Sequence, residues 1–187
     1  LVVAIATPLP YLLFDITSSE FRQFFTDAMI VAGGIAPSIL ALFIIPVLWK
    51  KRSERKGQAR ALWSALLMSV ILFIYGGFLG GLIQGQNVVI PAHYHGSIVG
   101  VTLAFMGIAY LMLPRFGYRN VAGWKMAYWQ PLVYGFGQIM HISGLAYSGG
   151  YGGLQRKTPC GGVPELAVDI KAAMGFMGLG GLLAIIG

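Results

Sequence analysis

The sequence predicts an all-α integral membrane protein, a polytopic bundle of about five to six transmembrane helices in a single domain over residues 1–187. Hydrophobic residues make up 57% of the chain and charged residues only 10%, whereas a soluble domain carries roughly a quarter charged residues. The chain contains several uncharged runs that are long enough, as helices, to cross a bilayer. The basic residues gather between these runs, which is typical of membrane-spanning helices.

The first part of the chain predicts one partial and one full span. Residues 1–14 are apolar but contain Pro8 and Pro10, so we expect the end of a membrane segment there. Residues 15–27 hold both acids and aromatics and predict a polar connector. Residues 28–49 carry no charge, and a run of this length can cross the roughly 30 Å of bilayer hydrocarbon.

The remainder of the chain predicts four further full spans. Each is an apolar run bounded by charged or glycine-rich residues, and their ranges are residues 61–83, 88–113, 126–148 and 165–187. The loop between the last two spans, residues 149–164, is rich in glycine.

The distribution of charge predicts the orientation. Residues 50–60 contain six basic residues and one acid, and loops of this kind stay on the cytoplasmic side. Nine of the thirteen Lys and Arg residues then lie on the inner side, and five of the six acids on the other. The net charge of +7 therefore reflects topology, and we expect no nucleic-acid partner. We expect a location in a prokaryotic inner (cytoplasmic) membrane.

Two further features bound the class of protein. The single cysteine, Cys160, excludes an internal disulfide framework. The sequence begins at Leu1 without a methionine or a basic n-region, so we expect a processed, split or partial chain without a signal peptide.

The main functional clue is a His-X-His pair at the start of the third of the five full spans. His93 and His95 are two of only three histidines in the chain. A helix turns by about 100° per residue, so their side chains are expected to point about 200° apart. Two such imidazoles can each serve a different cofactor, but they cannot chelate one small ion without unwinding the helix.

Haem is a cofactor that suits this arrangement. Imidazole is a good axial ligand of haem iron, and haem propionates need cations or donors when they leave water. The predicted topology puts Arg156 and Lys157 on the same outer side as His93 and His95. Structural roles remain open for all four residues, and for His141 we expect a buried, hydrogen-bonded side chain. Small residues around the pair are expected to leave room for a macrocycle.

The residues around the pair resemble a known family. The segment from Val89 through His93 and His95 opens a span that ends near Pro114, and it resembles the tenth helix of the haem-copper oxidase catalytic subunit. The resemblance implies that His93 ligates the iron of the high-spin haem and that His95 ligates the iron of the low-spin haem. It implies two haems, whose type the residues do not indicate.

Other segments extend this resemblance over essentially the whole chain. His141 and Gly144 occur in a pattern similar to the family's eleventh helix, and the Arg156-Lys157 pair stands for the two arginines that meet haem propionates there. The tripeptide at Ala36 looks like the eighth helix of the B-type branch. The chain is thus equivalent to the C-terminal part of the twelve-helix subunit I.

The chain departs from the family at the copper site. Leu12 and Leu13 stand where the family has an adjacent pair of copper-binding histidines, and Ala41 and Ile44 replace hydroxyl side chains of a proton path. Residues 85–89, before the His-X-His pair, are uncharged. Copper is therefore doubtful in this chain, and another subunit is expected to supply the remaining haem and copper ligands.

The resemblance implies a haem-binding transmembrane subunit of a respiratory terminal oxidase, within a multi-subunit oxidoreductase similar to cytochrome c oxidase. Electrons from a cytochrome c or a quinol would pass through the low-spin haem to the high-spin haem for reduction of oxygen. Other oxidase subunits and membrane lipid are the expected partners. An alternative is a subunit without copper that serves only electron transfer or scaffolding, and a third class is a transporter or channel whose histidines relay protons.

Overall fold

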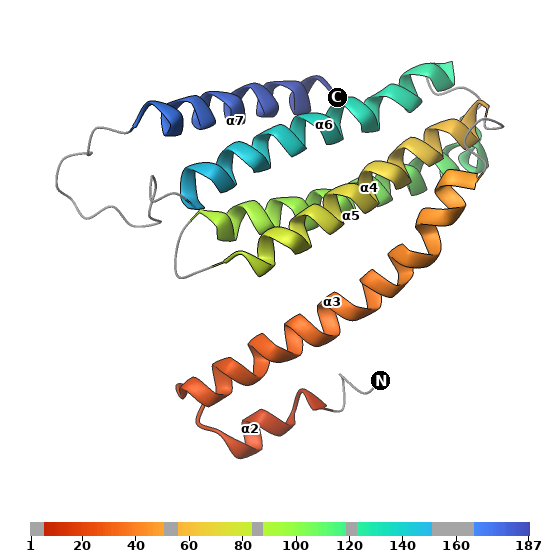
Figure 1. Cartoon of the computed structure of the whole chain (residues 1–187). Helices are drawn as coiled ribbons and strands as arrows, with labels where there is room; N and C mark the ends of the chain where they lie inside the picture. Colours follow the sequence, from red (N-terminus) through yellow and green to blue (C-terminus); the bar gives the residue numbers. More distant parts are fainter. Residues whose placement is uncertain (1–5, 51–55, 84–87, 119–122, 151–166) are drawn as a thin grey trace. The chain divides into compact units, whose positions relative to one another are not determined.

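The computed structural model describes residues 6–50, 56–83, 88–118, 123–150 and 167–187, and all regular secondary structure in these ranges is helical (Figure 1). The predicted all-α class is therefore confirmed for this part of the chain. The chain forms two compact units, Leu1–Lys50 and Lys51–Gly187. A single membrane domain requires both units to lie in one bundle, and it remains a prediction.

The first unit contains a short helix, α2 (Leu9–Leu13), and a long one, α3 (Ser19–Lys50). The prediction of a polar connector over residues 15–27 is wrong from residue 19 onward, because α3 already begins at Ser19. The cause is a cap: the Ser18 hydroxyl oxygen accepts a hydrogen bond from the Phe21 N–H at 3.1 Å, and serine is a favoured N-cap residue. The helix continues through Pro37 and Pro46.

The second unit is built from α4 (Gln58–Gly81), α5 (Val89–Met112), the 3-10 turn η1 (Leu113–Phe116), α6 (Gly123–Gly150) and α7 (Val168–Ile186). These helices coincide with the four predicted spans to within about three residues, the margin expected for helix ends. Helix α6 packs against each of the other three, and α4 also packs against α5 (Figure 1). Helix α6 is therefore the common neighbour in this unit.

Among the described residues, four helices are long and apolar enough to cross a membrane: Ser19–Lys50, Gln58–Gly81, Val89–Phe116 and Val168–Ile186. This agrees with an integral membrane protein. Helix α6 has the length, with 28 residues, but it is less apolar because it contains Gln130, Gln138 and His141. Its position as a span over residues 126–148 remains a prediction.

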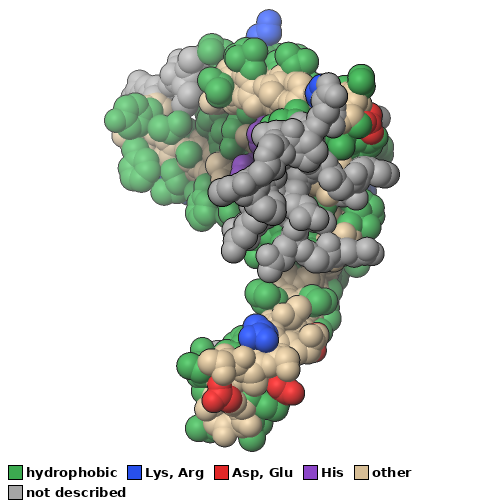
Figure 2. Space-filling view, turned by 90° about the vertical axis from the view of Figure 1, so that its left-hand side faces the viewer, with side chains coloured by type: hydrophobic (Ala, Val, Ile, Leu, Met, Phe, Trp, Pro, Cys, Tyr) green, Lys and Arg blue, Asp and Glu red, His purple; other side chains and the backbone are tan. Residues whose placement is uncertain are grey.

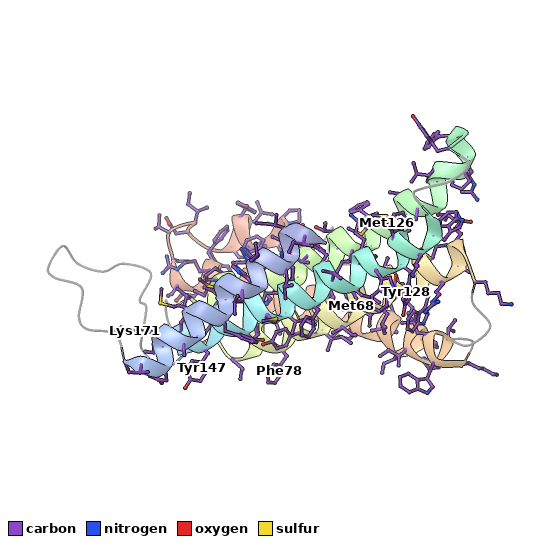
Figure 3. All side chains as sticks on the ribbon, turned by 90° about the horizontal axis from the view of Figure 1, so that it is seen from above. Met68, Phe78, Met126, Tyr128, Tyr147 and Lys171 are labelled. Carbon is purple, nitrogen blue, oxygen red and sulfur yellow. The ribbon has the colours of Figure 1, made fainter. Side chains whose placement is uncertain are left out.

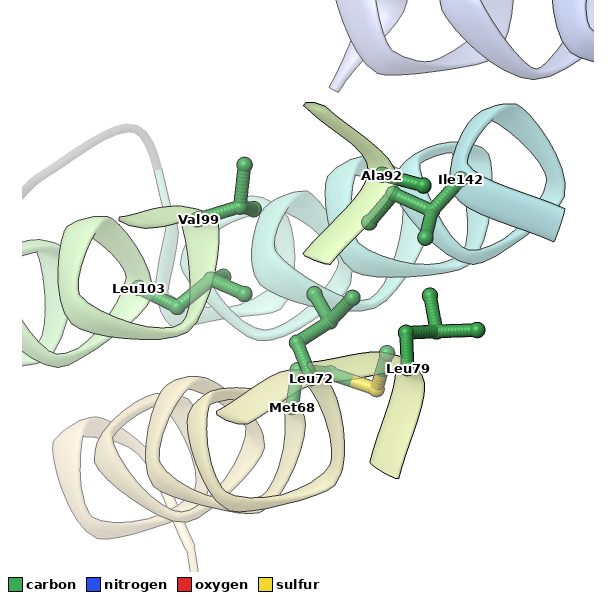
Figure 4. Close-up of a cluster of buried hydrophobic side chains, with 7 residues drawn as sticks. All are labelled: Met68, Leu72, Leu79, Ala92, Val99, Leu103 and Ile142. Atoms are coloured by element: carbon green, nitrogen blue, oxygen red, sulfur yellow. The ribbon is translucent and has the colours of Figure 1, made fainter. Parts of the chain in front are cut away.

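The core of the second unit is a cluster of apolar side chains from three helices. Helices α4, α5 and α6 supply Met68, Leu72, Leu79, Ala92, Val99, Leu103 and Ile142 (Figure 4). Large apolar side chains such as Phe78, Phe105 and Ile185 are instead exposed, and hydrophobic atoms cover much of the surface in Figure 2. Apolar residues on both the inside and the outside are typical of helices that face lipid.

Glycines set the distance between α4 and α5. A Cβ atom at Gly76 would lie 2.5 Å from the Ser97 backbone nitrogen, and one at Gly96 would lie 2.6 Å from the Gly76 Cα. No real Cβ tolerates such contacts, so the two backbones touch directly at this crossing. Close approach through small residues is the usual way in which membrane helices associate.

Candidate functional site

The His-X-His pair lies in the first two turns of α5. Helix α5 begins with Val88 as its N-cap, and the Ala92 N–H donates to the Val88 carbonyl at 3.2 Å. Pro91 fits this first turn because its missing N–H would have no partner within the helix. His93 and His95 are therefore held on regular helix close to one end of the second unit.

His93 packs against α4. Its Nδ1 lies 2.7 Å from the Gly76 carbonyl oxygen, and a Cβ at Gly80 would lie 2.8 Å from the same nitrogen. A carbonyl oxygen can only accept, so Nδ1 carries the proton and donates. In the neutral ring the lone pair is then on Nε2, the nitrogen that remains for a metal ion.

The contact between Gly76 and Gly96 makes this hydrogen bond possible. Because the two backbones meet at that crossing, the Gly76 carbonyl comes within reach of the imidazole one turn away on α5. The Ser69 hydroxyl reinforces the same pair of helices by donating to the Gly100 carbonyl at 2.6 Å. The His93 ring is thus oriented by backbone atoms, which no side-chain rotation can withdraw.

His95 faces a different helix. Its Nδ1 lies 3.2 Å from the Pro91 carbonyl oxygen, four residues back in α5. Its ring stacks on that of His141 in α6, with centroids 5.5 Å apart and planes at 27°. The His95 side chain is exposed, and Figure 2 shows histidine atoms at the surface of the protein. A cofactor could therefore reach His95 from outside the four helices.

His141 is held by α7. Its Nδ1 lies 3.1 Å from the Met177 carbonyl oxygen, and a Cβ at Gly181 would come within 3.5 Å of that nitrogen. The side chain is half-buried, so it is the hydrogen-bonded histidine that the sequence led us to expect. Its contact with His95 was not anticipated.

All three histidines therefore share one tautomer in their neutral form. Each Nδ1 donates to a backbone carbonyl, and each Nε2 carries the lone pair. Hydrogen bonding of one ring nitrogen to a carbonyl is the usual way in which proteins orient a metal-binding histidine. This donor chemistry fits the axial ligation of haem iron. Among the described residues no group of three or more His, Cys, Asp or Glu side chains could hold a metal ion.

The glycines near the histidines do not leave the space that we expected for a macrocycle. Gly96 and Gly100 are filled by the backbone of α4, and Gly144 by that of α7. Gly149 meets the N-cap residue Val88. These residues serve helix packing. These glycines therefore leave no room for a macrocycle, whereas the His95 side chain is exposed on the outer surface of the helices.

The remaining predicted site residues have separate outcomes. Arg156 and Lys157, the predicted propionate partners, lie outside the described residues. Leu12 and Leu13 end α2, and their side chains are 81% and 68% exposed. Hydrocarbon side chains offer no atom to a copper ion, whatever lies beside them.

Sequence reasoning missed the residues that orient the histidines. Gly76 supplies the acceptor for His93, and Met177 supplies the acceptor for His141. The spacing of Gly76 with Gly80, matched by Gly96 with Gly100 on the next helix, is the small-xxx-small pattern of close helix pairs. That pattern could have identified the α4–α5 crossing.

Comparisons with known proteins add relatives but no function. The chain is 35% identical to "Uncharacterized protein RP382" of Rickettsia prowazekii (strain Madrid E), over 93% of this chain and 40% of that protein. It is 32% identical to an "Uncharacterized protein" of Aquifex aeolicus (strain VF5), over 32% of this chain and 16% of the relative. The chain thus spans less than half the length of these relatives. No family model matches it. No solved structure matches it either.

Proposed function

We propose that this chain is a haem-binding transmembrane subunit of a respiratory oxidase of the haem-copper type, in which His93 and His95 ligate two different haems. The observation that carries the proposal is the divergence of the two imidazoles. His93 is anchored to α4 through the Gly76 carbonyl, while His95 stacks on His141 of α6. Each presents Nε2 as its metal-binding nitrogen, as an axial ligand requires.

The two histidines differ in their surroundings in a way that suits two roles. His93 is half-buried and fixed by a short hydrogen bond to backbone, and we assign it to the high-spin haem. His95 is exposed, and we assign it to the low-spin haem, whose second axial ligand another chain would supply. Haem iron bound at these positions would carry single electrons by cycling between its ferric and ferrous states.

The proposal includes the partners that the resemblance implies. Arg156 and Lys157 would meet haem propionates, because paired cations offset the cost of bringing carboxylates out of water. Other oxidase subunits would complete the haem and copper ligands, and a cytochrome c or a quinol would donate electrons. The membrane would be a prokaryotic inner membrane, with the histidine end of α5 toward the outer face.

The decisive experiment is spectroscopic. The chain is purified with its native complex in mild detergent, and haem is counted by the pyridine haemochrome method against protein mass. Two haems per chain, with one low-spin α-band in the reduced spectrum, is the expected result. A complex without haem that keeps its full activity would instead indicate the transporter or channel class.

A second candidate is an oxidase-derived subunit without a copper centre, which serves only electron transfer or scaffolding. The observation that favours it is the supply of ligands: the chain has three histidines in all, and Leu12 and Leu13 offer none. Carbon monoxide binding and copper analysis of the same complex separate the two candidates. A five-coordinate haem with stoichiometric copper supports the oxidase, and the absence of both supports the second candidate.

A further inference from the structure

A basic and aromatic pocket lies at the end of the second unit where α4 and α6 begin. We call it the Arg60 pocket. It has a volume of about 420 Å³, and its lining consists of Gly57, Arg60, Trp124, Lys125, Tyr128 and Trp129. Figure 3 shows Tyr128 toward the opposite end of the helices from Tyr147 and Lys171. The pocket is therefore separate from the histidine site, since Tyr147 lies six residues beyond His141 in α6.

The charge of the Arg60 pocket is positive. Arg60 and Lys125 line it, and none of the described residues in its lining is acidic. The Arg60 guanidinium carbon lies 4.0 Å from the centre of the Tyr128 ring, which is a cation–π contact. The N–H donors of a guanidinium point outward in its own plane. The contact with the Tyr128 ring uses none of these donors as a conventional hydrogen bond, so they can serve an oxyanion.

Aromatic side chains form the rest of the wall. Tyr128 contacts the Arg60 guanidinium, and its ring also lies nearly parallel to that of Trp63, with centroids 6.5 Å apart and planes at 14°. Trp124 and Trp129 complete the lining, and Trp129 is exposed. Tryptophan and tyrosine concentrate at the headgroup level of membranes, because their rings are apolar while their edges can donate hydrogen bonds. The wall therefore has the composition of an interface site.

The position of the pocket at the start of α4 also indicates the level of the membrane interface. Helix α4 begins at Gln58 directly after Gly57, whose φ of +52° suits glycine. Helix α4 is long and apolar enough to cross a membrane, so its first turn lies at the boundary between water and hydrocarbon. The adjacent segment, residues 50–60, carries six basic residues against one acid. This charge pattern predicts the cytoplasmic side of the membrane. Basic pockets between helices on that side favour anionic lipid headgroups.

We propose that the Arg60 pocket binds the phosphodiester headgroup of an anionic phospholipid, with Arg60 and Lys125 meeting the phosphate and the aromatic wall holding the glycerol region. The volume falls within the range of about 300–1,000 Å³ that is typical of small-molecule sites. A free phosphate would satisfy the same cations. The lipid is favoured because the pocket joins cations to tryptophans at the end of a membrane-length helix, where an acyl chain can continue along the apolar surface.

The test uses the full chain in its native complex, reconstituted into nanodiscs of phosphatidylcholine with an increasing share of phosphatidylglycerol. Native mass spectrometry counts the phosphatidylglycerol molecules retained by each variant. We expect Arg60→Gln and Lys125→Gln each to weaken the retention of phosphatidylglycerol about fivefold, and the double variant about 25-fold, since each basic residue near a membrane surface contributes a factor of this size. Arg115→Gln is the matched control, because Arg115 follows α5 and does not line the pocket.

The outcomes are distinct. Loss in the two pocket variants, with less than about a twofold change in the Arg115→Gln control, supports the lipid site. Equal losses in all three variants would show general attraction between surface charge and lipid, and would overturn it. A large excess of inorganic phosphate should not displace the lipid; full displacement would assign the pocket to free phosphate. Circular dichroism of each variant checks that the helices are retained, and Lys125→Arg should restore binding.

Discussion

The imidazole rings of His95 and His141 stack with their centroids 5.5 Å apart and their planes 27° from parallel. His141 is in turn bonded through Nδ1 to the Met177 carbonyl. This series of contacts connects α5, α6 and α7 through two histidines and one backbone oxygen. The orientation of the proposed low-spin ligand, His95, thus depends on two helices besides its own.

Removal of His95 tests the haem assignment most directly. We expect His95→Ala to abolish the low-spin α-band of the reduced spectrum, because the proposal makes His95 the ligand that this chain gives to the low-spin haem. His93→Ala should instead remove the carbon monoxide-binding haem and leave the low-spin band. Optical spectra of the purified complexes measure both. A His95→Ala complex with an unchanged low-spin band would refute the assignment.

His141→Phe tests whether His141 orients His95 or is itself a ligand. Phenylalanine keeps a flat ring beside His95 but has no nitrogen, so the low-spin band should persist at full intensity. His141→Ala removes the stacked ring, and we expect the band to broaden as His95 samples more orientations. Electron paramagnetic resonance of the oxidised haem records this spread. Loss of the haem in His141→Phe would make His141 a ligand and contradict the assigned role.

The crossing of α4 and α5 predicts opposite effects at two adjacent glycines. Gly76→Ala places a methyl group against the backbone of Ser97, and overpacking of this kind costs about 1–3 kcal/mol. Gly77→Ala meets no described atom within 4 Å and should gain about 0.5–1 kcal/mol from helix propensity. Thermal unfolding in one detergent compares the two variants. Equal melting temperatures would mean that the helices do not meet at Gly76.

Asp15 predicts a local pH dependence in the first unit. Hydrogen bonds from the Thr17 hydroxyl and the Thr17 N–H hold the pKa of the Asp15 carboxyl below its ordinary value. A pKa that is lower in the folded state stabilises the fold above the unfolded pKa, and this contribution is lost as pH falls through the folded pKa. Thr17→Val should raise the Asp15 pKa in an NMR titration. An unchanged titration curve would show that the turn does not persist.

The sequence predicted the helices of the second unit well because their apolar runs are bounded by charge or glycine. It failed over residues 19–27, where Glu20, Arg22 and Asp27 suggested a connector. Serine capping at Ser18 and the aromatic contacts of Tyr11 with Phe21 and Phe25 extend α3 there. Hydropathy indicates which residues lie in lipid, but it does not indicate where a helix begins. The capping serine, Ser18, is the sequence signal that would have placed the start of α3 correctly.

The site was predictable in part. Helical periodicity alone gave the divergence of His93 and His95, since it follows from 100° per residue. The partners of each ring were not predictable, because Gly76 and Met177 act through backbone carbonyls that carry no sequence signature. The glycines near His95 were misinterpreted for a related reason: composition does not distinguish a glycine that admits a cofactor from one that admits another helix.

The predicted membrane span formed by α6 bears on how the second unit would insert into the bilayer. Three of its polar side chains each contact a different helix: Gln130 accepts from Tyr110 of α5, Ser143 shares a hydrogen bond with Tyr75 of α4, and His141 bonds to the Met177 carbonyl of α7. Helices α4 and α5 are synthesised before α6. When the translocon releases α6, these two helices can therefore already be in the bilayer and can pair with its polar side chains. We expect α6 placed alone in a glycosylation-mapping reporter to insert poorly, and α4 to α7 together to insert it fully. Membrane insertion of this unit would then be cooperative, because α6 would insert only together with its neighbouring helices.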